Sequence, residues 1–310
     1  MIHIDFEAVH RLASVGSLVE PPRRAFGSPA ISPERAHYDL PSPKTPRSLL
    51  LMPSWQPAGG IGVKIVTVFP DNDARGLPSV NAAYVLLSGQ TGQPRALLDG
   101  RALTLLRTAG VSALAADLLA PTDPGRLLMV GTGALSRYLI EGHLAVRQYE
   151  SVQIWGRDRT KAATVARDLA SRGWPITVAD ELEIAVRSAT VVSCATLAQT
   201  PLIEGGWLRR GAHLDLVGSF RPDMREADDA CMTGALVVVD TRSALEESGD
   251  LAEPIARGVL AADDIFTLNT LLATSCAAPR GSRTVFKSVG VAHADLAVAE
   301  HLLERSGLGG

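Results

Sequence analysis

The pattern of apolar and polar positions divides the chain into a first part of short runs and a longer part in which strand-like and helix-like segments alternate. In the first part, short β-like runs cover 49–52, 62–69, 82–87 and 95–98. Turn-forming residues at 70–73 and 89–92 separate them, and this spacing predicts a small, mostly antiparallel sheet. Two proline-rich stretches, 21–24 and 41–46, are expected to be turns or extended connections because proline fixes the backbone.

A helical period replaces the β-like runs between residues 101 and 119. The apolar residues near helical spacing are Leu103, Leu106, Val111, Leu114 and Leu118. Pro121 ends this segment, which we expect to connect a first domain to a second. The tail at 294–305 is again amphipathic, and we expect it to pack back on the first domain.

Strand and helix patterns alternate between residues 126 and 287. Strand candidates are 127–130, 152–155, 176–178, 190–193, 213–217, 236–240 and 284–287, and helical stretches include 160–171 and 180–188. Near-continuous Val and Leu strands in such an alternation are typical of a parallel sheet covered on both faces. The expected fold is therefore α/β: a Rossmann-type doubly wound sheet at 121–290, and a smaller α+β domain at 1–120 with 291–310.

Composition narrows the class of protein. The 310 residues are 46% hydrophobic, enough for a large core, and the net charge of −3 predicts no basic face for nucleic acid or an anionic membrane. No apolar run reaches the roughly 20 residues that span a bilayer, and the N-terminus lacks the pattern of a secretory signal. We therefore expect a cytoplasmic protein.

Cysteine and histidine usage argues against structural disulfides and metal. Cys194, Cys231 and Cys276 stand far apart and are interpreted as free thiols in a reducing compartment. The seven histidines make no metal-binding spacing, so no metal site is predicted.

A glycine turn follows the strand candidate at 127–130. Gly131 and Gly133 lead through Ala134 and Leu135 into a helical pattern. Strand, glycine turn and helix in this order can bind the pyrophosphate of a dinucleotide, because the helix N-terminus presents free N–H groups. Ser136 stands where the fingerprint has its third glycine, and a plain tight turn is the alternative.

The end of the next strand candidate indicates which dinucleotide is bound. Gly156 occupies the position where an acidic residue often holds the adenosine ribose, and Arg157, Arg159 and Lys161 follow. Guanidinium groups suit an additional 2′-phosphate, so NADPH is favoured over NADH. The alternative is a solvated basic helix start with Asp158 as its N-cap.

Several segments, taken together in order, resemble the family of ornithine cyclodeaminase, mu-crystallin, ketimine reductases and related amino-acid dehydrogenases. The matching stretches are Gly62-Val63-Lys64, 76–79, 106–116, the glycine loop, 215–226, 239–242, 247–251 and 284–290. The resemblance implies a homodimer in which the first domain, 1–120 with 291–310, supplies the substrate-binding pocket and the dimerisation interface. It also implies nicotinamide chemistry on a carbon that bears an amino or imino nitrogen beside a carboxylate. Its substrate would be a small imino or amino acid.

The resemblance also assigns roles to three cations. Lys64 lies in an apolar strand, where a cation is costly without an anionic partner, and would grip the substrate carboxylate or act near the reacting nitrogen. Arg107 lies in an apolar part of its helix and could bind a carboxylate in two-pronged fashion. Arg35 matches the family's first carboxylate-binding arginine. The alternatives are a lysine reaching solvent and two surface arginines.

Short hydroxyls and loop residues complete the expected site. Ser79 is expected near the substrate. Thr196 is expected beside the cofactor, with a turn cap as its alternative. The full expected cofactor set is Thr108, Gly131, Gly133, Ala134, Leu135, Arg157, Asp158, Arg159, Thr196, Val217, Ser219 and Val289.

One departure from the family selects among its reactions. Phe220 stands where the cyclodeaminase and alanine dehydrogenase branches carry an aspartate beside the reacting amine. Because phenylalanine can neither hold an ammonium nor act as a base, the resemblance favours reduction of a preformed imine. The expected reaction is Δ1-pyrroline-2-carboxylate to L-proline with NADPH, and the six-membered piperideine analogue is a second substrate. Alternatives are ornithine cyclodeaminase, an amino-acid dehydrogenase, or a non-catalytic small-ligand-binding protein like mu-crystallin.

Overall fold

The computed structural model describes residues 1–42, 45–57, 59–123, 125–274 and 281–308. The chain divides into two compact units, Met1–Thr108 with Val291–Gly310, and Ala109–Gly290. The boundary falls inside helix α3 (Gly100–Leu119) and not after residue 120, where the sequence placed it. The second half of this helix belongs to unit 2 because the Ser112 hydroxyl donates to Asp215, 3.1 Å away, a tertiary contact that periodicity cannot reveal.

Unit 1 contains a six-stranded sheet in the order β1-β6-β5-β4-β3-β2. Its strands are β1 (Ile2–Ile4), β2 (Ala36–Leu40), β3 (Arg47–Trp55), β4 (Ile61–Val68), β5 (Val80–Leu87) and β6 (Pro94–Asp99). Strands β2 to β6 pair antiparallel, as predicted, and β1 pairs parallel with β6. The sequence pattern missed the two edge strands, β1 and β2.

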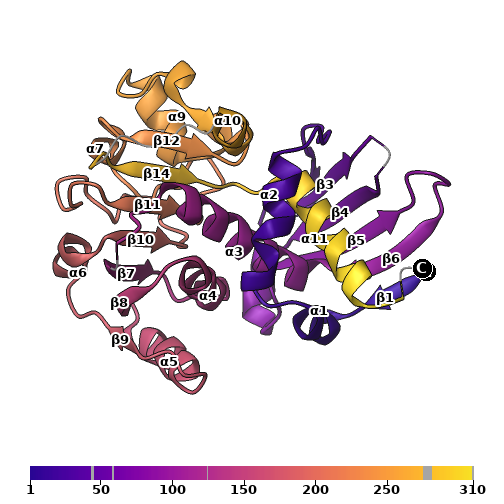
Figure 1. Ribbon diagram of the computed structural model, residues 1–310, viewed down its shortest axis with the longest axis horizontal. Helices are drawn as coiled ribbons and strands as arrows, with labels where there is room; N and C mark the ends of the chain where they lie inside the picture. The colour runs from indigo at the N-terminus through magenta and orange to yellow at the C-terminus, as the bar shows by residue number, and fades with distance from the viewer. Residues whose placement is uncertain (43–44, 58, 124, 275–280, 309–310) are drawn as a thin grey trace. The chain divides into compact units, whose positions relative to one another are not determined.

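Helices cover this sheet. They include α1 (Phe6–Leu12), α2 (Glu20–Phe26) and α11 (Ala292–Arg305), with short 3-10 turns η1 (Gly16–Leu18) and η2 (Pro70–Arg75). Figure 1 shows α11 lying across β3, β4 and β5 with α2 beside it. The expectation that Pro21 and Pro22 form a turn is wrong, because both lie in the first turn of α2, where a missing N–H leaves no hydrogen bond unmade.

Unit 2 contains an eight-stranded sheet in the order β13-β12-β14-β11-β10-β7-β8-β9. Its strands are β7 (Gly125–Val130), β8 (Tyr149–Trp155), β9 (Ile176–Val178), β10 (Val191–Cys194), β11 (His213–Leu216), β12 (Leu236–Val239), β13 (Phe266–Thr267) and β14 (Thr284–Lys287). Every pair is parallel, which confirms the doubly wound α/β prediction. The strand order reverses at β7 and β10, and ligands bind at such a switch point, outside the carboxyl ends of the strands.

Helices connect these strands. They are α4 (Ser136–Val146), α5 (Arg159–Ala170), α6 (Leu182–Ser188), α7 (Asp229–Met232), α8 (Ala244–Glu247), α9 (Gly249–Ala256) and α10 (Leu268–Thr274), with a 3-10 turn, η3 (Ala262–Asp264). Helix α3 is long and apolar enough to cross a membrane, but 78% of its most apolar window is buried, as in the core helix of a soluble protein. Cys194 and Cys231 are buried free thiols, and Cys276 lies outside the described residues.

Candidate active site

The glycine loop after β7 is shaped by close backbone contact. Gly131 has a φ of 121°, and a Cβ there would lie 2.4 Å from the Ala195 carbonyl oxygen. The Ser136 hydroxyl donates to the Gly131 carbonyl at 2.9 Å, so the residue that departs from the fingerprint stabilises the loop. A Cβ on Gly133 would meet nothing within 4 Å, and Leu135 gives α4 no side-chain cap. Open space before an uncapped helix start fits a dinucleotide pyrophosphate.

The charged residues that follow β8 differ in their contacts. A Cβ on Gly156 would lie 2.5 Å from Thr132 Cγ2, so the glycine loop packs against this position. The Asp158 carboxylate caps α5 by accepting from the backbone N–H groups of residues 160 and 161, as in the alternative interpretation, and Arg159 forms an ion pair with Asp180. Arg157 is exposed and makes no hydrogen bond or ion pair with any residue that the structure describes.

The remaining unit 2 candidates follow the carboxyl ends of three strands. Thr196 follows β10, and its N–H and hydroxyl both donate to Glu226. Val217 and Ser219 follow β11, and the Ser219 hydroxyl donates to the Met224 carbonyl at 2.6 Å. Val289 follows β14, and its N–H donates to Asp240 at 3.2 Å. These residues therefore border the carboxyl edge of the sheet, with the two hydroxyls already bonded inside the protein.

Three charged side chains meet in the interior of unit 1. Lys64 comes from β4, Arg107 from α3 and Asp295 from α11. Lys64 Nζ donates to Asp295 Oδ2 at 2.7 Å, and Arg107 Nε donates to Asp295 Oδ1 at 2.8 Å. The residues are 2%, 5% and 0% exposed, so neither cation reaches solvent freely. The structure thus supplies the anionic partner that a lysine in an apolar strand requires.

Burial and charge together set the ionisation of this cluster. Burial, then the Arg107 charge, lower the pKa of Lys64 to about 8, against the opposing effect of Asp295; Arg35 lowers it further. Burial opposes ionisation of Asp295, but Arg107 and Lys64 outweigh it and hold the pKa of that carboxyl below its usual value. Lys64 and Arg107 carry two positive charges and Asp295 one negative charge, so the cluster has an excess positive charge that favours an anionic ligand.

A tyrosine beside Lys64 explains a glycine of the sequence motif. Tyr84 of β5 pairs directly with Lys64 across the sheet, and a Cβ on Gly62 would lie 1.8 Å from the Tyr84 hydroxyl oxygen. Only glycine leaves room for that ring. Burial, then the charges of Asp295 and Glu300, raise the pKa of Tyr84 well above its usual value, so its phenol stays neutral.

The other expected residues of unit 1 lie in α3 or just before strands of the sheet. Arg35 is half-buried immediately before β2, and its charge acts on Lys64. Thr108 is buried in α3 next to Arg107. Ser79 is half-buried before β5, and its carbonyl accepts from the Phe69 N–H at 2.7 Å. The substrate candidates therefore all belong to unit 1, and the cofactor candidates other than Thr108 belong to unit 2.

Sequence reasoning missed Asp295 and Glu226. Asp295 lies 231 positions from Lys64, and its only signal is an acidic residue within the apolar stretch 291–299. Glu226 lies among the charged and polar residues 221–229, where a fully buried carboxylate has no distinct signal.

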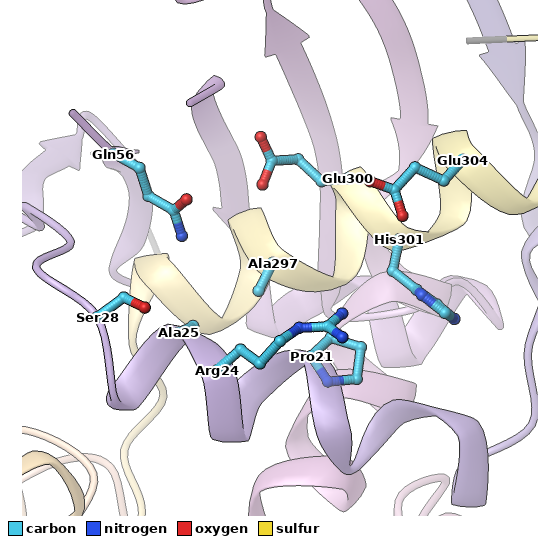
Figure 2. Close-up of a pocket in the computed structure, with 9 residues that line it drawn as sticks. All are labelled: Pro21, Arg24, Ala25, Ser28, Gln56, Ala297, Glu300, His301 and Glu304. Atoms are coloured by element: carbon cyan, nitrogen blue, oxygen red, sulfur yellow. The ribbon is translucent and has the colours of Figure 1, made fainter. Parts of the chain in front are cut away.

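A separate cavity of about 450 Å³ lies between α2 and α11. Figure 2 shows the residues that line it: Pro21, Arg24, Ala25, Ser28, Gln56, Ala297, Glu300, His301 and Glu304. The four residues from α11 recur at intervals of three and four and so share one helix face. At 3.6 residues per turn, Asp295 lies about 170° from the centre of that face. This cavity is therefore distinct from the Lys64–Arg107–Asp295 cluster.

Comparisons with known proteins agree over nearly the whole chain. A sequence model of the ornithine cyclodeaminase/mu-crystallin family matches residues 7–308. The Δ1-pyrroline-2-carboxylate reductase of Colwellia psychrerythraea is 35% identical over 314 residues, which cover 97% of this chain and 98% of that protein. The structure of the Thermococcus litoralis Δ1-pyrroline-2-carboxylate reductase in complex with NADH and L-proline has a TM-score of 0.92 and 29% identity, covering 99% and 97% of the two chains. An archaeal alanine dehydrogenase dimer with bound NAD has a TM-score of 0.91 and 26% identity, covering 99% and 96%.

Proposed function

The chain belongs to the ornithine cyclodeaminase/mu-crystallin family, and from this membership we propose that it reduces a cyclic ketimine carboxylate with NADPH. It is a nicotinamide-dependent oxidoreductase that acts on a carbon–nitrogen bond. The preferred substrate is Δ1-pyrroline-2-carboxylate, which gives L-proline, and the six-membered piperideine analogue is the second candidate. The observation that carries this proposal is the buried Lys64–Arg107–Asp295 cluster with its excess positive charge.

The cluster suits a substrate carboxylate. Asp295 accepts from Nε of Arg107, and the two terminal nitrogens of a guanidinium carry four further N–H donors. Two of these donors can bind one carboxylate in parallel, which fixes its orientation as well as its position. The charge of Arg35 also acts on Lys64 and adds positive potential to the cluster. The carboxylate would thus hold the adjoining imine carbon in one place.

Lys64 supports the proton transfer. A bound reduced nicotinamide supplies a hydride equivalent to the carbon of a C=N bond. The nitrogen then needs one proton, and Lys64 can donate it because a pKa of about 8 keeps the ammonium mostly protonated at neutral pH yet acidic enough to give the proton up. Asp295 holds the ammonium in position before the transfer and remains ionised after it.

The segment after β11 supports imine reduction over reactions that start from a free amine. Phe220 is 45% exposed there and offers no carboxylate. Asp223, three residues on, is bound in an ion pair with Arg221, whose Nε donates to it at 2.8 Å. The carboxylate in 220–223 is therefore paired with Arg221, and position 220 itself carries no group that could act as a base toward an amine.

The substrate assignment is tested by following NADPH and NADH oxidation with the five-membered and six-membered imines side by side with two competing reactions. We expect oxidation with the imines, faster with one ring size. Ammonia release from ornithine would favour a cyclodeaminase, and ammonia-dependent oxidation with a 2-oxo acid would favour an amino-acid dehydrogenase. Tight NADPH binding without turnover on any of them would support the non-catalytic alternative.

Arg157 is the residue that we propose for the 2′-phosphate of NADPH, because Arg159 already pairs with Asp180. Arg157→Ala is expected to raise the Kd for NADPH by at least about tenfold, since a hydrogen bond to a charged group contributes roughly 1.5–3 kcal/mol. The Kd for NADH is expected to stay within about twofold, because NADH lacks the phosphate. Nicotinamide fluorescence titration measures both constants, with Arg159→Ala as the matched control. Equal losses for the two cofactors would contradict the assignment.

We also propose a homodimer formed through unit 1. Strands β2, β4 and β5 of this unit expose the apolar side chains of Tyr38, Ile65 and Val80, and the similar alanine dehydrogenase is a dimer. Light scattering tests the proposal, since a particle of one chain, 32.7 kDa, would contradict it.

A further inference from the structure

The segments that follow β10 and β11 are interlocked. The Arg225 N–H donates to the Ala198 carbonyl at 2.8 Å, and the N–H groups of residues 202 and 203 donate to the Glu226 carbonyl at 2.9 Å. A Cβ on Gly218 would lie 2.2 Å from the Thr196 carbonyl oxygen, so the two backbones touch where the strands end. Movement of one segment therefore displaces the other.

The Glu226 side chain lies at the centre of this contact. It is 0% exposed. Oε1 accepts from the Thr196 N–H at 2.7 Å and from the Thr196 hydroxyl at 2.9 Å. Oε2 accepts from the Gly218 N–H at 2.7 Å and from the Ser219 N–H at 3.3 Å. One carboxylate thus binds both segments through four donors.

A second buried carboxylate, that of Asp250, binds the backbone at Glu226. Asp250 Oδ1 accepts from the N–H groups of Glu226, at 2.7 Å, and Ala227, at 3.0 Å. Asp250 Oδ2 lies 3.3 Å from Lys287 Nζ, and both side chains are 0% exposed. This arrangement ties α9 and β14 to the segment after β11, so Glu226 is anchored through its backbone as well as its side chain.

The segment that Glu226 holds is also the one that contacts the glycine loop. The Ala195 carbonyl, directly before Thr196, is the atom that a Cβ on Gly131 would strike. The Ala195 N–H donates to the Val130 carbonyl at 2.9 Å, immediately before the loop. The position of Thr196 therefore determines the shape of one wall of the dinucleotide site.

We propose that Glu226 is a positioning residue for the nicotinamide cofactor: by fixing Thr196, and with it Ala195, against the glycine loop, it sets the affinity of the site for the dinucleotide. This inference rests on the proposed function only in taking a nicotinamide dinucleotide as the ligand. It requires no imine and no turnover.

The charges around Glu226 set its ionisation, and its ionisation decides whether the four hydrogen bonds to the two segments can form. Burial, then Asp250, raise the pKa of Glu226 to about 7 against the opposing effects of Lys287 and the Thr196 hydrogen bonds. The Cys194 thiol of β10 also faces this group, and burial raises its pKa well above the usual value, so it stays neutral. A protonated Glu226 carries an O–H that needs an acceptor, but three of its four partners are backbone N–H donors. Protonation therefore breaks the arrangement, and a glutamine amide does the same.

The test is the Kd for NADH, measured by nicotinamide fluorescence between pH 6 and pH 8 without any substrate. NADH is the probe because the 2′-phosphate of NADPH titrates in this range. For wild type, the Kd is expected to be up to about tenfold higher at pH 6 than at pH 8, since a group of pKa 7 is about one-tenth ionised at pH 6. Glu226→Gln is expected to bind at least as weakly as wild type does at pH 6, with no pH dependence over the range.

The matched control is Glu183→Gln, which removes an exposed carboxylate of the same unit that pairs with Arg187. It should keep both the wild-type Kd and its pH dependence. A Glu226→Gln variant with wild-type affinity, or with the wild-type pH profile, overturns the proposal. If that variant does not fold, Glu226→Asp takes its place: it keeps the charge but is one methylene too short to bind Thr196 and Gly218 together, and a wild-type Kd for NADH in this variant overturns the proposal equally. Failure to reduce imines would contradict the proposed function and leave this measurement intact.

Discussion

Replacing Lys64 by methionine is expected to lower kcat/KM for the cyclic imine by about 10²–10⁴-fold, the usual contribution of a positioned general acid. Methionine has a similar length and is apolar, so it suits a position that is 2% exposed. Asp295 keeps Arg107 as its partner in this variant, at 2.8 Å. The loss should therefore reflect missing chemistry and not a collapsed site. The Kd for NADH should stay within about twofold, because no cofactor candidate of unit 2 is altered.

The pH dependence of the wild type tests the same role. Because the pKa of Lys64 is lowered to about 8, kcat/KM should fall above pH 8 as the ammonium loses the proton that the imine nitrogen needs. Unfolding does not explain such a fall. The unfolded lysine keeps the ordinary pKa of 10.5 and binds more protons than the folded one between pH 8 and 10.5. This group therefore makes stability rise with pH in that interval. Lys64→Arg, which stays charged throughout, should lack the decline, and a profile unchanged from wild type in this variant would contradict the assignment.

Replacing Asp295 by asparagine is expected to lower the free energy of unfolding of unit 1 by about 3–5 kcal/mol, the usual effect of breaking a buried ion pair. The substitution leaves Lys64 and Arg107 buried together without their anion. Lys64 can lose its proton, since its pKa is already lowered to about 8, but an arginine cannot. The remaining cost is therefore the burial of the Arg107 charge.

Thermal unfolding and hydrogen exchange of peptides from β4 and α11 measure this loss. The exchange data are needed because the chain has two compact units, and one transition temperature does not describe both. Glu304→Gln is the control: Glu304 is exposed on the opposite face of α11, and such surface changes stay within about 0.5 kcal/mol. An Asp295→Asn protein whose β4 and α11 exchange at wild-type rates would show that the cations do not depend on this carboxylate.

The local pattern of apolar residues and glycines was sufficient to predict the parallel sheet and its glycine loop. Apolar runs such as 127–130 and 236–239 form interior strands because a strand buried on both faces needs no polar alternation. Short edge strands such as β1 carry too few residues for a period to emerge. Pro21 and Pro22 misled the pattern because proline suits the first turn of a helix as well as a turn between elements.

The cations of the candidate site could be predicted from the sequence, but its buried carboxylates could not. A lysine in an apolar strand requires a partner, so the sequence points to Lys64 without revealing what faces it. Asp295 is 231 positions away and reaches Lys64 only through the packing of α11 on the sheet. Glu226 is similar, since its four donors come from two segments that meet only when β10 and β11 pair.

A carboxylate-binding role of Lys64 and Arg107 is tested by comparing reduction of Δ1-pyrroline-2-carboxylate with reduction of 1-pyrroline, the same ring without the carboxylate. If Lys64 and Arg107 form a carboxylate site, kcat/KM should be larger for the carboxylate by about 10⁴-fold, because a site built to hydrogen-bond a substrate group rejects an analogue that lacks it. Arg107→Met should lower kcat/KM for the carboxylate far more than kcat/KM for 1-pyrroline, and so remove most of that preference. Similar values of kcat/KM for the two imines in the wild-type protein would show that Lys64 and Arg107 do not bind the substrate carboxylate.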